Sequence, residues 1–195
     1  MTKQLLLSGN TVAIIPVDEV RGKLLVPQTA NRVHELAKIV AVGKKVKTDL
    51  AVGDIVFFQA NAMMSAYHTV KVDDKVVLII HHDDIIAKLS EPVVSIDTFK
   101  VHGAWVLCRA DVEQKSIVIP DTVEDINSIP YPHFFVLQVG GQANLDTSGN
   151  LLPDDEAINV CDEVIVDKAR TTIISLGDTK RVAYINRSFI FGKLQ

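Results

Sequence analysis

The sequence contains few of the residues that would indicate a disulfide scaffold, a metal centre or a membrane protein. Only two cysteines, Cys108 and Cys161, occur in 195 residues, and they lack C-x-x-C or zinc-ligand spacing. We therefore expect free thiols in a reducing compartment. The longest uninterrupted aliphatic run, Val76 to Ile80, is far shorter than the roughly 18 apolar residues of a membrane-spanning helix. No signal-like segment opens the chain, so we expect a soluble cytoplasmic protein without a membrane partner.

A large charge of one sign is also missing. Lys and Arg total 20 against 24 Asp and Glu, which gives a net charge of -4 at pH 7. Nucleic-acid binding rests on clustered basic side chains, and the one local group, Lys44, Lys45 and Lys47, is interpreted as a solvated turn. The chain has no G-x-S-x-G, P-loop or G-x-G-x-x-G motif. We therefore predict no nucleic-acid partner, no enzyme activity, no catalytic residue and no cofactor.

Histidine and acidic residues meet at one place, His81-His82-Asp83-Asp84. This stretch has the composition of a metal site, but neighbouring residues of a strand point to opposite faces of a sheet. The other histidines named here have no carboxylate or cysteine at ligand spacing. They are His34, His68, His102 and His133. The sequence therefore predicts no metal site.

Short apolar segments bounded by Gly, Pro, Asp and Asn run through the whole chain. Four of them are Val12–Pro16, Ile39–Gly43, Ile55–Phe58 and Val76–Ile80. Their period of two and their length are typical of strands. Only Thr29–Lys38 has helical spacing, and it is too short for more than a turn or two. The predicted fold class is therefore all-β.

The same segments recur in the same order in the second half of the chain. Val52–Phe58 (VGDIVFF) matches Val160–Val166 (VCDEVIV), and Lys75–Leu89 matches Lys180–Leu194. Because only the lengths of the intervening loops differ, we predict two copies of one unit. The junction is placed near Glu91-Pro92, so residues 1–92 and 93–195 would each form a small β-barrel.

Two apolar tripeptides, each followed by proline, lie at matching places in the two copies. They are Leu24, Leu25, Val26 and Ile117, Val118, Ile119. Each fits either a buried strand or an exposed docking segment, and for the first tripeptide the two interpretations stand nearly even.

Several of these motifs together resemble one family, the GroES-type co-chaperonins (ten-kilodalton chaperonins). VGDIVFF at 52–58, followed by KVDDKVVLIIHHDDIIAKL at 71–89, is similar to the last half of GroES, and IVAVG at 39–43 fits the same pattern. SIVIPDT at 116–122 resembles the G-I-V-L-P segment of the mobile loop in that family. Tandem duplication also occurs in chloroplast co-chaperonins, and some bacteriophages carry divergent ones. Without a transit-like start, a phage-like or bacterial origin is favoured here.

The resemblance implies two tandem GroES-like barrels that oligomerise into a ring and cap a GroEL-like chaperonin during ATP-dependent folding. ATP would be bound by the partner chaperonin. In the family, the aliphatic tripeptide of the mobile loop docks on the chaperonin, which assigns chaperonin binding to Ile117, Val118, Ile119, Leu24, Leu25 and Val26. Two barrels per chain imply a homo-oligomeric ring of three or four chains.

The first copy departs from the family pattern. Its mobile loop is short, and few residues separate Gly43 from Gly53, which leaves no room for a roof hairpin. The second copy retains a roof hairpin at Asn144–Asp155, with a tight turn at Ser148-Gly149-Asn150, but Cys161 replaces a family glycine. The alternative function is a structural or assembly ring protein, such as a virion component, that reuses the barrel without chaperonin docking.

Overall fold

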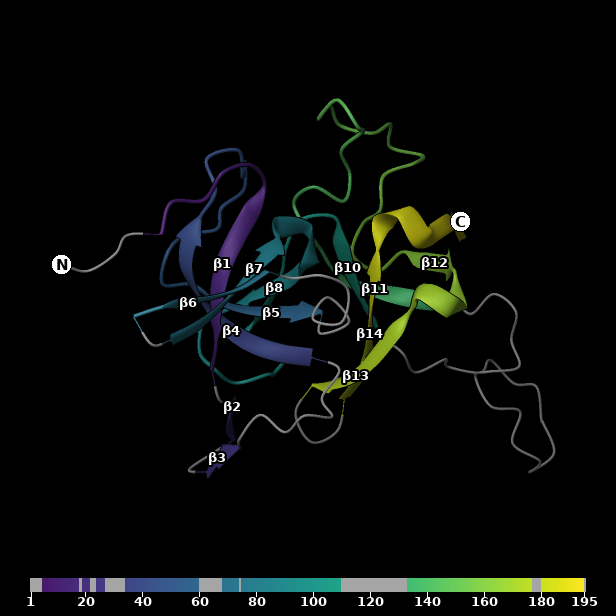
Figure 1. The fold of residues 1–195 in the computed structure, drawn as a ribbon. Helices are drawn as coiled ribbons and strands as arrows, with labels where there is room; N and C mark the ends of the chain where they lie inside the picture. Colours follow the sequence, from purple (N-terminus) through teal and green to yellow (C-terminus); the bar gives the residue numbers. More distant parts are fainter. Residues whose placement is uncertain are drawn as a thin grey trace. The chain divides into compact units, whose positions relative to one another are not determined.

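The computed structural model describes the ranges 5–17, 19–21, 24–26, 34–59, 68–73, 75–109, 133–176 and 180–194. The regular elements in these ranges are β-strands and short 3-10 turns (Figure 1), which confirms the predicted all-β class. No helix in the described part of the chain has the length and apolar character needed to span a bilayer. The chain divides into two compact units, Met1–Gly103 (unit 1) and Ala104–Gln195 (unit 2).

Unit 1 contains a seven-stranded antiparallel sheet in the order β6-β7-β1-β4-β5-β8-β9. Its strands are β1 (Thr11–Pro16), β4 (His34–Val42), β5 (Ile55–Gln59), β6 (His68–Val72), β7 (Lys75–His81), β8 (Ile85–Leu89) and β9 (Phe99–Val101). A 3-10 turn, His82–Asp84, joins β7 to β8. Two further strands, β2 (Glu19–Arg21) and β3 (Leu24–Val26), form a separate two-stranded sheet.

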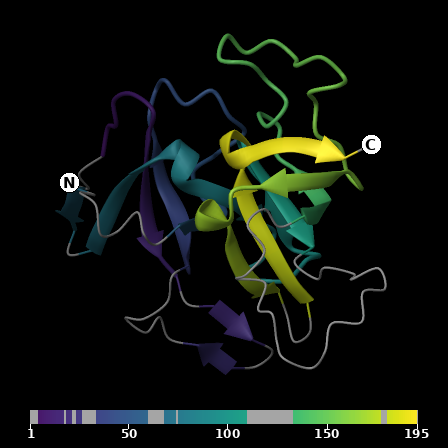
Figure 2. The ribbon, with the colours of Figure 1, turned by 90° about the vertical axis from the view of Figure 1, so that its right-hand side faces the viewer.

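Unit 2 contains a six-stranded antiparallel sheet in the order β13-β14-β10-β11-β12-β15. Its strands are β10 (Trp105–Arg109), β11 (His133–Val139), β12 (Glu163–Val166), β13 (Thr172–Leu176), β14 (Lys180–Asn186) and β15 (Ile190–Leu194). Two 3-10 turns, Lys168–Arg170 and Arg187–Phe189, lie between strands. Figure 2 shows β12 and β15 side by side, with the 3-10 turn before β15.

The two sheets have one topology. Replacing β6, β7, β1, β4, β5 and β8 by β13, β14, β10, β11, β12 and β15 converts the first strand order into the second. Register shifts also fall at equivalent places, Ala13/Ile14 and Leu107/Cys108 in the first pair of strands. A second pair of shifts lies at Phe57/Phe58 and Ile165/Val166. Each shift is a bulge that bends its strand and increases the local twist.

Among the described residues, the main sheet of unit 1 has one strand more than the sheet of unit 2, because β9 pairs with β8 at its edge. Phe99, Lys100 and Val101 lie opposite Leu89, Lys88 and Ala87. The division between the units therefore falls after Gly103, beyond the predicted junction at Glu91-Pro92.

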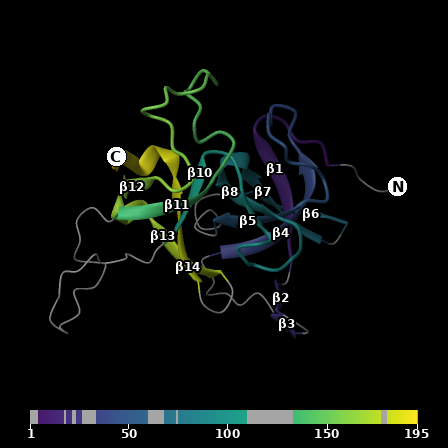
Figure 3. The same ribbon diagram turned by 180° about the vertical axis from the view of Figure 1, so that it is seen from behind.

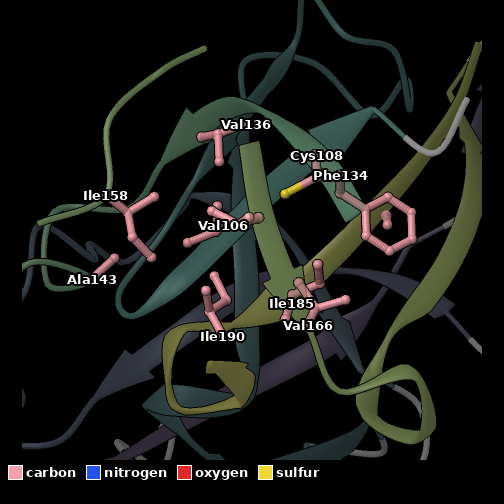
Figure 4. Packing of buried hydrophobic residues seen from close by; sticks show 11 residues of the cluster. Val106, Cys108, Phe134, Val136, Ala143, Ile158, Val166, Ile185 and Ile190 are labelled. Atoms are coloured by element: carbon pink, nitrogen blue, oxygen red, sulfur yellow. The ribbon is translucent and has the colours of Figure 1, made fainter. Parts of the chain in front are cut away.

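The two cores use equivalent positions but different side-chain sizes. In unit 1, a small Ala37 accompanies a large Phe58, whereas in unit 2 the equivalent residues are a large Phe134 and a small Val166. Exchanges that conserve total volume are the best tolerated in a close-packed core. Figure 4 shows the unit 2 side chains pointing toward one another, with Cys108 beside Phe134. Burial raises the pKa of the Cys108 thiol to about 12, so this free cysteine is unreactive.

The connection between the fourth and fifth strands of unit 1 also contributes to the core. Leu50 packs under the sheet, and Ile158 occupies the equivalent place in unit 2. Fully burying such a side chain stabilises the fold by about 1.5 to 3 kcal/mol. Gly43 starts this connection. A Cβ on this residue would lie 2.5 Å from the carbonyl oxygen of Gly9, so the two backbones can approach this closely only because residue 43 has no side chain.

The helical spacing seen around residues 29–38 is misleading. His34–Lys38 form the first half of β4, and residues 27–33 lie outside the described ranges. Leu36 and Ala37 are both buried although they are neighbours in a strand. Neighbouring strand residues face opposite sides, so this part of β4 is covered on both faces and lacks a period of two.

The turn before β5 and the equivalent turn before β12 each require a left-handed backbone. Gly53 has a φ of +101°, and Cys161, at the equivalent position of unit 2, has a φ of +75°. Glycine adopts this conformation without steric cost, whereas a side chain is strained there. The predicted replacement of a glycine by Cys161 therefore changes the residue but not the backbone geometry.

Charged residues hold the connection between β4 and β5 against β8 in unit 1. Lys88 Nζ lies 2.8 Å from Asp54 Oδ2 and donates a 2.7 Å hydrogen bond to the carbonyl oxygen of Asp49. His102, whose side chain is 4% exposed, has its Nδ1 3.3 Å from Asp49 Oδ1. In unit 2 the equivalent Lys193 donates to the carbonyl oxygens of Asp154 and Ala157.

Burial lowers the pKa of His102, and the nearby carboxylate of Asp49 only partly offsets this effect. Burial alone would raise the pKa of Asp49, but Lys88 and then His102 outweigh it and hold that pKa below its usual value. Within the described part of the chain, His102 Nε2 is buried and makes no hydrogen bond. The folded state therefore favours a neutral His102.

We expect Cys161→Gly to stabilise unit 2 by about 1 kcal/mol, because it removes the strain of a side chain at positive φ. Trp105 is the single tryptophan and is buried in unit 2, so urea unfolding followed by its fluorescence measures this unit. Cys161→Ala is the matched control, since it removes the thiol and keeps the Cβ. An equal gain from both variants would show that the thiol, rather than the backbone, causes the strain.

We expect the free energy of unfolding of unit 1 to fall as the pH drops below about 6.5, the usual pKa of histidine. Folding lowers the pKa of His102, so in this range the unfolded chain binds a proton that the folded chain does not yet accept. Urea unfolding followed by circular dichroism at about pH 8 and about pH 5.5 measures the loss. His102→Gln should make it smaller, and an unchanged loss in the variant would contradict this assignment. At about pH 8, histidine is neutral in the folded and the unfolded chain, so a difference in stability between the variant and the wild-type protein there reports only altered packing.

Candidate functional site

The first predicted docking tripeptide lies outside the barrel sheet. Leu24–Val26 form β3, which pairs only with β2 among the described residues, with Leu25 opposite Val20. Figure 2 shows this ribbon as two separate arrows. A buried core strand would hydrogen-bond with the sheet of unit 1 on at least one side. Among the described residues, the backbone of Leu24–Val26 therefore takes no part in the barrel sheet, and the docking role of this tripeptide stays a prediction.

The second predicted docking tripeptide, Ile117, Val118 and Ile119, lies outside the described residues. It belongs to the connection from β10 to β11, and β2 and β3 belong to the equivalent connection from β1 to β4. The common topology thus assigns both tripeptides to the same connection of the barrel. At the end of β10, where this connection begins, the guanidinium of Arg109 lies 5.3 Å from the ring centre of Phe135.

Unit 2 has a hairpin at the place where the roof hairpin was predicted. Leu145 and Leu151 form a bridge, and Asp146 Oδ1 accepts hydrogen bonds of 2.8 Å from the backbone N–H groups of Ser148 and Asn150. Gly149 has a φ of +86°, which confirms the tight turn predicted there. The hydrogen bond from the backbone of Asn150 is the main reason that the pKa of Asp146 is lowered. Leu151 is 81% exposed at the end of this hairpin. Figure 3 shows the hairpin extending from the sheet of unit 2.

The base of the hairpin is clamped by one side chain. Asn144 Nδ2 donates to the carbonyl oxygen of Ile158 at 2.7 Å, and Asn144 Oδ1 accepts from the Ile158 N–H at 2.8 Å. This amide pairing fixes the hairpin to a residue of the core. In unit 1, the connection at residues 43–54 is a set of short turns without a strand bridge among the described residues. The lack of a roof hairpin in the first copy stays a prediction.

The histidine-rich turn differs from the prediction. His81 ends β7 and His82 begins a 3-10 turn, so the two rings do not point to opposite faces. They stack with their centres 4.8 Å apart and 26° between their planes. The reason given for expecting no metal here was therefore wrong. The missed signal was a cap: His81 Nδ1 accepts from the Asp83 N–H, as Asn186 Oδ1 accepts from the Ser188 N–H in unit 2.

The two sheets differ at the edge formed by β8 in unit 1 and by its counterpart β15 in unit 2. In unit 1, β8 is covered by β9, whereas β15 is the edge of its sheet and has no further strand beside it among the described residues. The segment equivalent to β9 at the start of the chain is Leu5–Leu7. Leu5 and Leu7 pack against a face of the sheet formed by Ala13, Ala41 and Val77, and Leu6 is 77% exposed.

Comparison with known proteins gives a family match within unit 1 and three similar relatives. The family model described as "Chaperonin 10 Kd subunit" matches residues 13–89. The "Co-chaperonin GroES" of Kosmotoga olearia is 33% identical over 87 residues, which cover 43% of this chain and 93% of that protein. The "Co-chaperonin GroES" of Pseudothermotoga lettingae is 36% identical over 87 residues, again 43% of this chain and 93% of the relative. That of Thermotoga neapolitana is 35% identical over 89 residues, which are 43% and 92% of the two chains.

These relatives match over more than nine tenths of their own length. Residues 13–89, which the family model matches, contain both bulges of unit 1 and the separate β2–β3 ribbon. The chain therefore belongs to the chaperonin 10 family, the family of the GroES co-chaperonins.

Proposed function

We propose that the protein is a cytoplasmic co-chaperonin, whose ring caps a GroEL-like chaperonin and assists ATP-dependent protein folding without enzymatic activity of its own. The observation that carries the proposal is the position of Leu24–Val26, whose backbone pairs in a ribbon outside the sheet of a unit similar to GroES. On this proposal, these residues and Ile117–Ile119 dock on the chaperonin.

The energy of docking favours many weak contacts over one strong contact. Burying three aliphatic side chains contributes about 5 to 9 kcal/mol per loop, at about 1.5 to 3 kcal/mol each. Ordering about ten loop residues costs on the order of 1 kcal/mol per residue or more. A single loop would therefore bind weakly. Loops linked in a ring bind at high effective concentration after the first has docked, so the function requires assembly.

We propose that the chain is a tandem duplication, with residues 1–92 and 93–195 as the two copies. The shared strand order and the equivalent bulges support this division. Phe99–Val101 then belongs to the second copy by sequence, although it extends the sheet of the first. The contact-based boundary after Gly103 follows from this pairing.

The β8–β9 pairing also supplies a geometry for the ring. By equivalence, Leu5, Leu6 and Leu7 of the next chain would lie opposite Leu194, Lys193 and Gly192 on the open edge of β15. Backbone hydrogen bonds of this kind are how one chain adds a strand to another. Three chains would give six barrels and four chains would give eight.

We expect the triple substitution Ile117→Ser, Val118→Ser and Ile119→Ser to abolish capping and to leave the ring intact. Each serine forfeits about 1.5 to 3 kcal/mol of apolar burial, and the loss is repeated around the ring. Negative-stain microscopy with a GroEL-type ring and ATP counts the capped complexes. The same change at Leu24–Val26 shows whether both tripeptides bind.

Leu151→Ser is the matched control for this experiment, because Leu151 is an exposed aliphatic residue outside both tripeptides. Capping should persist in this variant. Failure of the wild-type protein to cap any GroEL-type ring would instead favour the structural or assembly ring protein.

We expect removal of residues 2–7 to convert the assembled ring into single chains, because the open edge of β15 then has no strand to accept. Native mass spectrometry measures the number of chains. Leu6→Ser is the control, since the side chain of Leu6 is exposed while its backbone is retained. A shortened chain that still forms the wild-type oligomer would place the ring contact elsewhere.

A further inference from the structure

The turn between β7 and β8 brings two imidazoles and one carboxylate together on unit 1. His81 Nδ1 lies 3.2 Å from Asp83 Oδ2, and His82 Nδ1 lies 3.1 Å from Asp83 Oδ1. One donor atom from each of the three residues lies within 4.8 Å of the others. We propose that His81, His82 and Asp83 form a binding site for a divalent transition-metal ion of the Zn²⁺ type.

The spacing of these atoms fits one shared cation. Zinc binds imidazole nitrogen and carboxylate oxygen at about 2.0 to 2.2 Å. Two ligands of one such ion are then about 3.0 to 3.5 Å apart, as follows from tetrahedral or right-angled geometry. The His81–Asp83 and His82–Asp83 separations of 3.2 and 3.1 Å already lie in that range. The donor atoms of the two histidines lie within 4.8 Å of each other, so the stacked rings have to move toward one ion to complete the set.

The electrostatics of the turn also favour a cation. The hydrogen bond from the Asp83 N–H to His81 Nδ1, at 3.4 Å, requires a lone pair on that nitrogen. The same nitrogen lies 3.2 Å from Asp83 Oδ2, so a cation bound there would meet an imidazole nitrogen and a carboxylate oxygen. Because Nδ1 has one lone pair, the bound ion would replace the 3.4 Å hydrogen bond from the Asp83 N–H.

His82 contributes a second imidazole nitrogen to the site. Its Nδ1 is buried, and within the described part of the chain it makes no hydrogen bond despite the 3.1 Å approach to Asp83. Its backbone N–H is held by the carbonyl oxygen of Asn10, so the residue is fixed before a metal arrives.

The donor set indicates the class of ion. Two imidazoles with a carboxylate suit Zn²⁺, Cu²⁺ or Ni²⁺, whereas Mg²⁺ and Ca²⁺ prefer sets of oxygen atoms. Three protein ligands leave at least one position for water. A bound ion would join the end of β7 to the turn before β8.

Unit 2 shows that the turn itself does not need these side chains. The equivalent turn, Arg187–Phe189, is preceded by Asn186, whose Oδ1 accepts from the Ser188 N–H at 3.1 Å. His81→Asn and Asp83→Ser therefore introduce residues that already support the same turn in this chain. They remove one ligand each and should keep the fold.

The test uses the untagged, full-length protein, freed of metal with a chelator and titrated with ZnCl₂ by calorimetry. We expect one equivalent per chain at this site and an affinity at least about tenfold lower in His81→Asn and in Asp83→Ser. His133→Gln is the matched control, because His133 is an exposed histidine whose Nδ1 lies 3.2 Å from Glu163 Oε1 in unit 2. It should bind zinc as the wild-type protein does.

Imidazole ¹⁵N spectra identify the ligands independently of affinity. Zinc should shift ring nitrogens of His81 and His82 in the wild-type protein, and circular dichroism should show that each variant remains folded. Zinc affinity unchanged in both ligand variants, or shifts confined to other histidines, would overturn the proposal. An unfolded His81→Asn variant would leave Asp83→Ser and the wild-type spectra to decide.

Discussion

Both units depend on the same constraint: a short antiparallel sheet has to curve around a small core. Each sheet meets it with two bulges at equivalent places, in β4 and β8 of unit 1 and in their counterparts β11 and β15 of unit 2. A bulge adds a residue to one strand and bends it, which helps the sheet to curve around its core. Because the backbone sets the curvature, side-chain sizes could change in compensating pairs, as Ala37 with Phe58 and Phe134 with Val166 illustrate.

The core and the proposed docking segment of unit 1 come from different parts of the chain. The core of unit 1 is supplied by the strands of the sheet and by the connection that contains Leu50. Leu24–Val26 belong to a different connection, and their backbone pairs with β2 outside the sheet. A two-stranded ribbon on its own is marginally stable in water. A segment of this kind is able to exchange its own weak pairing for contacts with a partner, whereas a strand of the sheet would have to break the barrel.

Much of the fold was predictable because most strands bury one face and therefore alternate. The segments at 12–16, 55–58 and 76–80 gave their strands directly, and the repeated order gave two sheets of one topology. The prediction failed where that physical basis was missing. Leu36 and Ala37 are buried together because β4 is covered on both faces, which imitates helical spacing. His81 and His82 were treated as strand neighbours because a three-residue turn has no periodicity, and only its cap, shared with Asn186, distinguishes it.

The β8–β9 pairing changes what assembly of the proposed ring requires. Phe99–Val101 are joined to β8 by a short segment of the same chain, so this junction forms without loss of translational freedom. A ring of two-barrel chains then associates from half as many bodies as a ring of single barrels of equal size. Before assembly, Leu5 and Leu7 pack on the chain's own sheet, against Ala13, Ala41 and Val77. This contact covers apolar surface that would otherwise favour aggregation. The junction with the next chain therefore has to offset the loss of this packing, which makes it the weaker of the two junctions and the point at which the ring would open.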